Sequence, residues 1–232
     1  MVTPPQPLLS RRGAFLVVPL LLTALVCAPS FAQDLPEVTI ARVQYGGGGD
    51  WYADEQSLPE LLAFARQETL LDLALREDAV ELTSDKLFAY PYLYLTGHGN
   101  VAFSETEARR LRRYLDGGGF LHIDDNYGLD TAIRREMRKV YPEQDFVEVP
   151  HDHPVYSSHF RFPDGLPKIH EHDGQPAQGF GLFHEGRLVV FYSYESDLGD
   201  GWEPGDVHQN PPEKREAALR MGTNLLVYAM TF

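Results

Sequence analysis

Short apolar runs that suit β-strands alternate with amphipathic segments that suit helices along most of this 232-residue chain. Strand-like runs occupy residues 38–45, 79–82, 90–96, 120–123 and 146–149, and helical patterns lie at 57–65, 104–115 and 130–140. This alternation predicts an α/β fold with a mostly parallel sheet. Two further runs, 180–184 and 187–194, predict a hairpin around Glu185-Gly186, and a closing helix is expected over 212–230.

Two irregular stretches interrupt this pattern. Residues 151–178 are rich in proline, histidine, aspartate and glycine, and residues 196–205 are rich in glycine and aspartate. We expect both to be ordered loops, and a loop as long as the first is usually functional when it lies inside a compact domain. Capping-box patterns that start at Ser57 and Ser104 predict where two of the helices begin.

The first 32 residues have the features of a cleavable secretion signal. Two arginines precede an apolar run over 14–26, and Ser30 and Ala32 are small residues that suit cleavage before Gln33. The sequence therefore predicts an exported, periplasmic protein in which residues 33–232 form a single domain. The alternative is an uncleaved N-terminal membrane anchor, which would need a longer apolar run.

The chain is strongly acidic, with a formal net charge of −14, and the predicted signal contains two arginines but no acidic residue. The domain itself is therefore more negative still, and such a surface repels nucleic acid and anionic lipid. We expect neither as a partner, and no membrane insertion of the domain. The only cysteine, Cys27, lies in the predicted signal, so the domain has no disulfide, thiolate ligand or cysteine nucleophile.

Three polar turns follow strand-like runs directly, at residues 46–51, 96–100 and 124–127. In a parallel sheet, ligands bind in the crevice at the carboxyl ends of the strands, where these turns would meet. Glycines let the backbone turn tightly there. The turns supply most of the residues that we predict to bind a ligand: Gly48, Asp50, Trp51, Asn100 and Tyr127.

Asp124 and Asp125 are adjacent carboxylates at the end of a strand, and their repulsion falls if one is protonated, binds a cation or caps a helix. They can act as a general base, a nucleophile or a metal ligand, or one can cap a turn while the other stays in solvent. His98, which lies between two glycines, is the predicted catalytic partner. His122 lies on the same face of the strand as Asp124 and can orient it, or can simply belong to the core.

Two His-x-His patterns lie in the first irregular stretch, His151/His153 and His170/His172. Residues two apart in an extended segment face the same way, so each pair can hold a divalent ion such as zinc through imidazole nitrogens. The alternative is that the spacing arises by chance in a histidine-rich chain.

The two tryptophans, Trp51 and Trp202, both lie in loops rich in glycine and aspartate. Aromatic faces beside carboxylates suit sugar rings, and Trp202 with Glu195 completes the predicted binding set. The alternative is that both rings cover the core beneath their loops. Glu195, Asp197 and Asp200 offer oxygen ligands, but their spacing does not match a calcium-binding EF-hand.

Five long motifs stand out: YGGGGDWY at 45–52, YLTGHGN at 94–100, GGGFLHIDD at 117–125, LPKIHEHDG at 166–174 and YESDLGDGW at 194–202. Together they resemble domain of unknown function family 4159, over essentially all of the predicted domain. The resemblance implies no activity. It implies a fold similar to the class I glutamine amidotransferases, a flavodoxin-like three-layer αβα sandwich. Amidotransferases of that group carry a cysteine at the turn that corresponds to residues 123–126, so their chemistry is excluded here.

Two functions remain open from the sequence. The first is a periplasmic hydrolase-like enzyme with an Asp/His cleft, which acts on a small polar or glycan-like substrate. The second is a non-catalytic module of the cell envelope, which binds a ligand or assembles with a protein partner. Both depend on the polar turns meeting in one hollow at the edge of the sheet.

Overall fold

A computed structural model of the chain describes residues 1–4 and 37–232. The predicted signal and the predicted cleavage before Gln33 lie outside the described residues, apart from the first four positions. Residues 37–232 form one unit around a single sheet. Within the described residues, no helix is both long and apolar enough to cross a membrane.

Seven strands of the described chain form this sheet, in the order β2-β1-β3-β4-β7-β6-β5. Their bounds are β1 Ala41–Gln44, β2 Asp78–Glu81, β3 Tyr92–Leu95, β4 Phe120–Asp124, β5 Val147–Glu148, β6 Gln178–His184 and β7 Arg187–Tyr194. The first five strands of that order are mutually parallel, whereas β6 pairs antiparallel with β7, and β5 pairs antiparallel with β6. The parallel strands follow the flavodoxin-like order, which reverses between β1 and β3. The predicted mostly parallel sheet with a C-terminal hairpin is confirmed.

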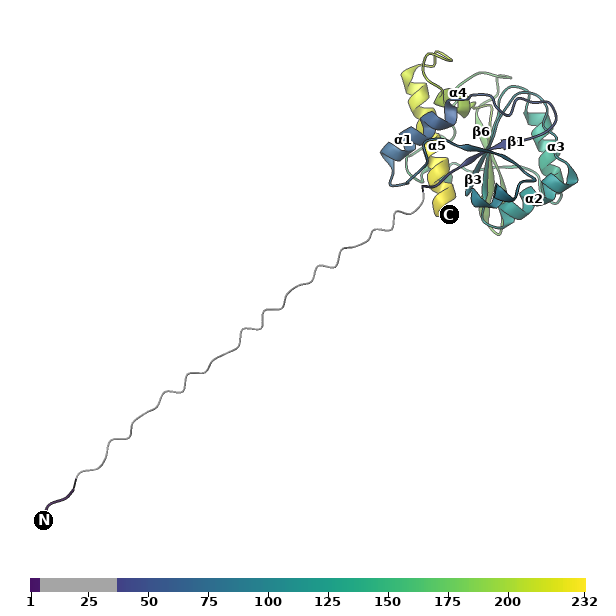
Figure 1. Cartoon of the computed structure of the whole chain (residues 1–232). Coiled ribbons are helices and arrows are strands. Elements are labelled where there is room, and N and C mark those ends of the chain that lie inside the picture. The colour runs from purple at the N-terminus through teal and green to yellow at the C-terminus, as the bar shows by residue number, and fades with distance from the viewer. Residues whose placement is uncertain (5–36) are drawn as a thin grey trace. The chain divides into compact units, whose positions relative to one another are not determined.

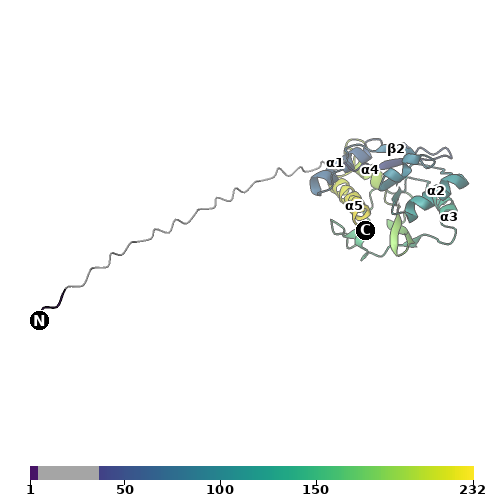
Figure 2. The ribbon, with the colours of Figure 1, turned by 60° about the horizontal axis from the view of Figure 1, so that its bottom comes forward.

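Helices cover both faces of the sheet, which confirms the three-layer sandwich (Figure 1). One layer contains α1 (Ser57–Glu68), α4 (Leu198–Trp202) and α5 (Pro212–Thr231). The other contains α2 (Glu105–Asp116) and α3 (Asp130–Val140). The view turned by 60° shows the same grouping (Figure 2). Short 3₁₀ turns at Asp85–Ala89 and Pro154–Tyr156 complete the helical segments of the described chain.

Alternate side chains of β4 face opposite helical layers, because successive residues in a strand point to opposite sides of the sheet. Leu121 and Ile123 pack in the core on the side of α2 and α3, whereas Phe120 packs in the core on the side of α1 and α5. His122 and Asp124 share the Phe120 face, and both are fully buried there. This register carries two polar groups into an apolar layer, where each needs hydrogen-bond partners.

Of the two predicted capping boxes, one is present and the other is not. At Ser104 the box is present, because Ser104 and Glu107 each accept a hydrogen bond from the other's backbone amide. At the start of α1 it is absent, since Ser57 lies inside the helix and its hydroxyl donates to the carbonyl of Asp54. Burial of Ser57 turns its side chain inward and away from a capping position.

The predicted loop at residues 196–205 contains α4, which the sequence analysis missed. Its sequence, Leu-Gly-Asp-Gly-Trp, has low intrinsic helix propensity because two of the five residues are glycine. The amides of Leu198 and Gly199 both donate to the buried Asp124 carboxylate. A tertiary contact from β4 therefore holds this helix, and local sequence preference does not.

Gly199→Ala should lower the free energy of unfolding by about 1–3 kcal/mol, because the site has no room for a larger residue. A methyl group there would lie 2.6 Å from the Tyr94 hydroxyl and 3.0 Å from Oδ2 of Asp124. Urea denaturation followed by circular dichroism measures the change. Gly205→Ala is the matched control, because a methyl group at Gly205 meets no atom within 4 Å. Equal stabilities for the two variants would contradict this view of α4.

Candidate functional site

A chain of buried hydrogen bonds ends at the Asp124 carboxylate. The Tyr92 hydroxyl lies 2.9 Å from Nδ1 of His122, and Nε2 of His122 lies 2.9 Å from Oγ of Ser193. The hydroxyl of Ser193 donates to Oδ1 of Asp124 or to the Ile123 carbonyl, and in either case His122 donates to Ser193 and accepts from Tyr92. Burial lowers the pKa of His122 to about 3, which keeps its imidazole neutral. His122 therefore orients Asp124, but through Ser193.

Asp124 is a positioning residue in this structure. Its two oxygens accept from four donors: the hydroxyls of Tyr94 and Ser193 and the amides of Leu198 and Gly199. Burial and the neighbouring Asp197 carboxylate raise the pKa of Asp124 to about 8, against the four donors that favour its ionised form. Asp124 is fully buried, so it anchors α4 to β4 and does not face a ligand. This matches the interpretation in which one of the paired carboxylates caps a helix.

Asp125 turns away from Asp124 and meets a histidine. Its Oδ2 accepts from the Glu195 amide at 3.0 Å and lies 4.0 Å from Nδ1 of His172. On the other side of the ring, Nε2 of His172 lies 3.1 Å from Oδ2 of Asp197. The imidazole is therefore placed between two carboxylates, and the three side chains are only 5–6% exposed. Burial raises the pKa of Asp125 to about 6, and hydrogen bonding to Asp197 raises the pKa of His172.

Two more histidines lie beside this group. Nδ1 of His170 is 2.7 Å from Oδ2 of Asp200 and 3.3 Å from Oδ2 of Asp197, and Nδ1 of His208 is 3.3 Å from the same Asp200 oxygen. Hydrogen bonds to Asp197 and Asp200 raise the pKa of His170 to about 10. Burial acts to raise the pKa of Asp197, but hydrogen bonds from His170 and His172 hold it at about 2. At neutral pH, His170 is thus a cation between two anions.

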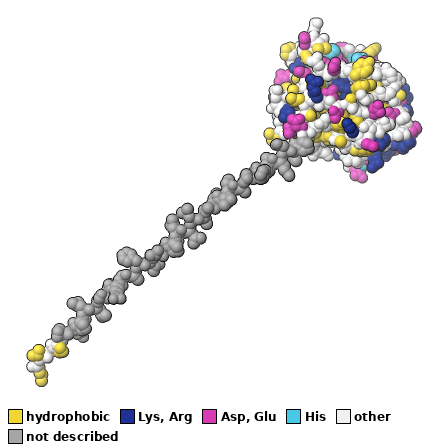
Figure 3. Space-filling model, in the orientation of Figure 1, with side chains coloured by type: hydrophobic (Ala, Val, Ile, Leu, Met, Phe, Trp, Pro, Cys, Tyr) yellow, Lys and Arg dark blue, Asp and Glu magenta, His cyan; other side chains and the backbone are white. Residues whose placement is uncertain are grey.

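These side chains form one group that we call the Asp–His cluster. Its members are Asp125, His170, His172, Asp197, Asp200 and His208. They come from the turn after β4, the long segment before β6, the segment after β7 and the loop before α5. Near α4, histidine side chains reach the surface beside acidic ones (Figure 3).

Asp54 borders the cluster from the loop between β1 and α1. Nδ2 of Asn126 donates to Asp54 at 3.1 Å, and Oδ1 of Asn126 accepts from the Thr96 hydroxyl at 2.9 Å. Burial and the Asp200 carboxylate raise the pKa of Asp54 to about 7. Segments that follow β1, β3, β4 and β7 therefore meet at the carboxyl ends of the parallel strands, which is where ligand sites of such sheets lie.

The predicted turns after β1 and β3 join each other, apart from the cluster. The backbone amide of His98 donates to Asp50, and Nδ1 of His98 lies 3.1 Å from Oδ2 of the same carboxylate. Nδ2 of Asn100 donates to the carbonyl of Gly47 at 3.0 Å, and the exposed Gly48 has a positive φ of 89°. The side chains of His98 and Asp50 are exposed by 54% and 36%. The structure thus brings these four predicted residues together but places His98 outside the Asp–His cluster.

The two His-x-His pairs have different surroundings. His170 and His172 converge on Asp197, as a shared ligand site requires. His151 instead packs edge-on against Tyr156, and His153 accepts a hydrogen bond from the Val155 amide and packs against core rings. The exposed His151 and the half-buried His153 therefore lie against core rings and not with the other pair.

The three aromatic residues that were predicted to bind a ligand also have different surroundings. Trp202 is fully buried and its indole donates to the Ala218 carbonyl at 2.8 Å, so the expectation that it binds a sugar is replaced by a core role. Trp51 is partly buried against the core. Tyr127 is 58% exposed, and its ring meets the His172 ring edge-on at 6.0 Å. Tyr127 therefore remains an accessible aromatic group at the cluster.

Glu195, another predicted binding residue, holds the long segment before β6 in place. Its carboxylate lies 2.6 Å from Nζ of Lys168 and accepts from the Asp173 amide at 2.9 Å. Burial acts to raise the pKa of Glu195, but these contacts keep it below the usual value. The Lys168 ion pair thus ties the segment that carries His170 and His172 to the end of β7.

Sequence reasoning missed several members of the site. In the sequence, Asp197 and Asp200 suggest only oxygen ligands for calcium, although both lie in the 194–202 motif that carries the family resemblance. Asp54 and His208 are single polar residues in loops and gave no spacing signal. Attention to every acidic residue of the long motifs would have found the first two.

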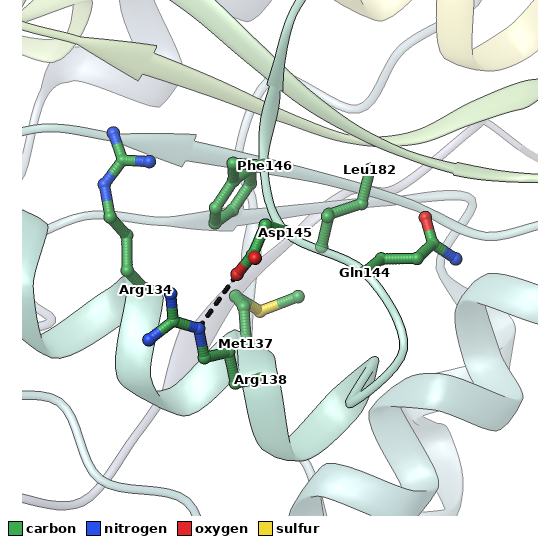
Figure 4. A pocket seen from close by; sticks show the side chains of 7 residues that line it. All are labelled: Arg134, Met137, Arg138, Gln144, Asp145, Phe146 and Leu182. Carbon is green, nitrogen blue, oxygen red and sulfur yellow. Dashed lines mark hydrogen bonds and ion pairs between the residues drawn. The ribbon is translucent and has the colours of Figure 1, made fainter.

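The hollows in the described part of the chain lie outside the cluster, and two of them are relevant here. A cavity of about 90 Å³ is lined by Arg134, Met137, Arg138, Gln144, Asp145, Phe146 and Leu182, with Arg138 paired to Asp145 at 2.9 Å (Figure 4). It contains none of the predicted site residues. A groove of about 380 Å³ is lined by Phe64, Gly205, Asn210, Pro212, Arg215, Glu216 and Leu219. This groove borders the cluster, because Oδ1 of Asn210 lies 3.0 Å from Nε2 of His170.

Comparison with protein families gives one match, to the family described as Domain of unknown function (DUF4159), over residues 39–230. The match covers most of the chain, so the chain belongs to this family, and the resemblance inferred from its motifs is confirmed. Comparison with curated proteins gave no match.

His170 should make the stability of the domain depend on pH. Its pKa is raised from 6.5 to about 10, so its contribution is fully present below pH 6.5 and is lost as the pH rises towards 10. In metal-free buffer the free energy of unfolding should fall between pH 8 and pH 10. This range lies above the pKa of about 8 of Asp124, so it separates the titration of His170 from that of Asp124. His170→Gln should flatten this fall, and the exposed control His98→Gln should not. Urea denaturation at a series of pH values measures it, and parallel curves for the wild type and His170→Gln would refute the assignment.

Proposed function

We propose that this domain is an exported hydrolase-like enzyme with Asp125 and His172 as its acid–base pair. The description of its family assigns no activity. The observation that carries the proposal is the His172 imidazole held between the carboxylates of Asp125 and Asp197. A small polar or glycan-like molecule is the substrate class, because charged and hydrogen-bonding side chains dominate this end of the sheet.

Asp125 has the properties of a general base. Its pKa of about 6 lies close to neutral pH, where a base combines a large ionised fraction with useful proton affinity. In hydrolysis, Asp125 accepts a proton from the attacking water. The backbone amide of Glu195 binds Oδ2 and fixes the orientation of the carboxylate.

His172 has the properties of the matching acid. Nδ1 of His172 lies 4.0 Å from Asp125 and has no hydrogen-bond partner among the described residues, so it is available for proton transfer. Asp197, at the other ring nitrogen, stabilises the protonated imidazole. The protonated ring donates its proton to the leaving group, and the exposed ring of Tyr127 lies beside it on the solvent side.

Asp125→Asn should lower the rate of hydrolysis by at least about 100-fold, because a positioned general base contributes roughly that much. A panel of p-nitrophenyl esters, phosphates and glycosides provides the assay. For any substrate that the wild type cleaves, kcat/KM should rise as the pH passes about 6, and this inflection should disappear in the variant. Asp50→Asn, in the exposed turn outside the cluster, is the control and should retain activity. Full activity of Asp125→Asn would rule out the proposed base.

Ligand binding without turnover is the second candidate, and the groove next to Asn210 favours it. The groove has apolar walls from Phe64 and Leu219 and charged groups from Arg215 and Glu216, a combination that suits a ligand with apolar and polar parts. In this case a ligand would raise the melting temperature equally in the wild type and in Asp125→Asn, with no product formed. Product formation that requires Asp125 would decide for the enzyme.

A further inference from the structure

We propose that the more accessible part of the Asp–His cluster binds one divalent metal ion of the zinc type. Its ligands are His170, Asp197, Asp200 and His208. This set differs from both His-x-His pairs of the sequence, because it takes one histidine from such a pair and the second from the loop before α5. The site does not require the proposed hydrolysis, since an ion can bind there without turnover.

The spacing of the donor atoms supports the site. One donor atom each from His170, Asp200 and His208 lies within 4.8 Å of the others. The separations from His170 Nδ1 to Asp197 and from His208 Nδ1 to Asp200 are both 3.3 Å. Ligands that bind one zinc ion at about 2.0–2.2 Å in a tetrahedral arrangement lie roughly 3.3–3.6 Å apart. The 2.7 Å between Nδ1 of His170 and Oδ2 of Asp200 is shorter than this range, so these two atoms must move apart when an ion binds.

His170 is oriented as a metal-binding histidine is. Nδ2 of Asn210 donates to the carbonyl of Asp200 at 3.1 Å, so the other amide atom, Oδ1, is the acceptor that faces Nε2 of His170 at 3.0 Å. Nε2 therefore carries a proton, and Nδ1, which faces the two carboxylates, is the ring nitrogen that can bind an ion. Such a hydrogen bond from the second ring nitrogen is the usual companion of a metal-bound histidine.

Charge favours a cation at this position. Asp197 and Asp200 both face His170, and Asp54 lies beside Asp200, so three carboxylates surround the same space. A divalent cation bound among these carboxylates offsets their mutual repulsion.

An independent observation comes from atoms without partners. In the part of the chain that the structure describes, only two buried side-chain polar atoms lack a hydrogen bond, Nδ1 of His172 and Oδ1 of Asp197. Both side chains are just 6% exposed, and folded proteins rarely leave such atoms unpaired. Asp197 faces both histidines through Oδ2, and its other oxygen, Oδ1, is the one without a partner. The unpaired oxygen therefore belongs to one of the four ligands.

The donor types select the kind of ion. Two imidazole nitrogens and two carboxylates suit zinc and similar divalent transition metals. Calcium and magnesium prefer sites made of oxygen alone, so they should bind more weakly. The side chains of His170 and His208 are each 28% exposed, which gives an ion a path from solvent.

The test is a titration of the EDTA-treated, full-length chain with zinc chloride by isothermal titration calorimetry. We expect one ion per chain. Asp200→Asn and His208→Gln should each weaken binding by at least about 10-fold. His98→Gln and His151→Gln, which change histidines outside the cluster, should bind as the wild type does.

Circular dichroism tests whether each variant is folded. If Asp200→Asn does not fold, His208→Gln still tests the site, because His208 lies in a loop. Absence of stoichiometric binding in the wild type overturns the inference, and so does unchanged affinity in the folded ligand variants. Turnover that needs Asp125, in a chain that binds no zinc stoichiometrically, would remove the metal site and leave the proposed enzyme. Tight binding of one ion with no turnover on any substrate would leave the metal site and remove the proposed enzyme.

Discussion

The buried carboxyl group of Asp124 is the constraint on which the rest of the structure depends. A carboxylate without solvent contact is tolerated only where donors surround it, and here they come from β3, β7 and the first turn of α4. Satisfying this one group fixes a short, glycine-rich helix against the end of β4. The same helix then carries Asp200, with Asp197 at its entry, to the histidines of the long segment before β6.

The Asp–His cluster can persist in the fold because its charges are paired across separate segments. Asp197 is the shared member: Oδ2 faces His170 on one side and His172 on the other. An ion bound beside His170 would therefore change the proton affinity of His172 through a single carboxylate. The proposed acid–base pair and the proposed metal site are tested separately, yet electrostatics would couple them at this residue.

The sheet and most helices could be predicted, because strand and helix periodicity is local in the sequence. The Ser104 capping box and the shared face of His122 and Asp124 are likewise local. The site was only partly predictable, because its remaining members lie in loops that distant contacts position. Trp202 illustrates the reason: its indole is buried against Gly222 of α5, where a methyl group would lie 2.8 Å from the ring. The sequence around Trp202 does not indicate that its ring packs against this distant glycine.

The backbone after β7 has a consequence for engineering. Glu195 and Asp197 both adopt left-handed conformations, with φ of 55° and 61°, although neither is glycine. Side chains in this region cost about 1–3 kcal/mol relative to a relaxed backbone. Glycine at either position would relax the backbone, but it would also remove the carboxylate that binds Lys168 or the one that His170 and His172 share. Loss of one partner of a buried charge pair costs about 3–5 kcal/mol, more than this strain, so selection for heat resistance should retain both acidic residues.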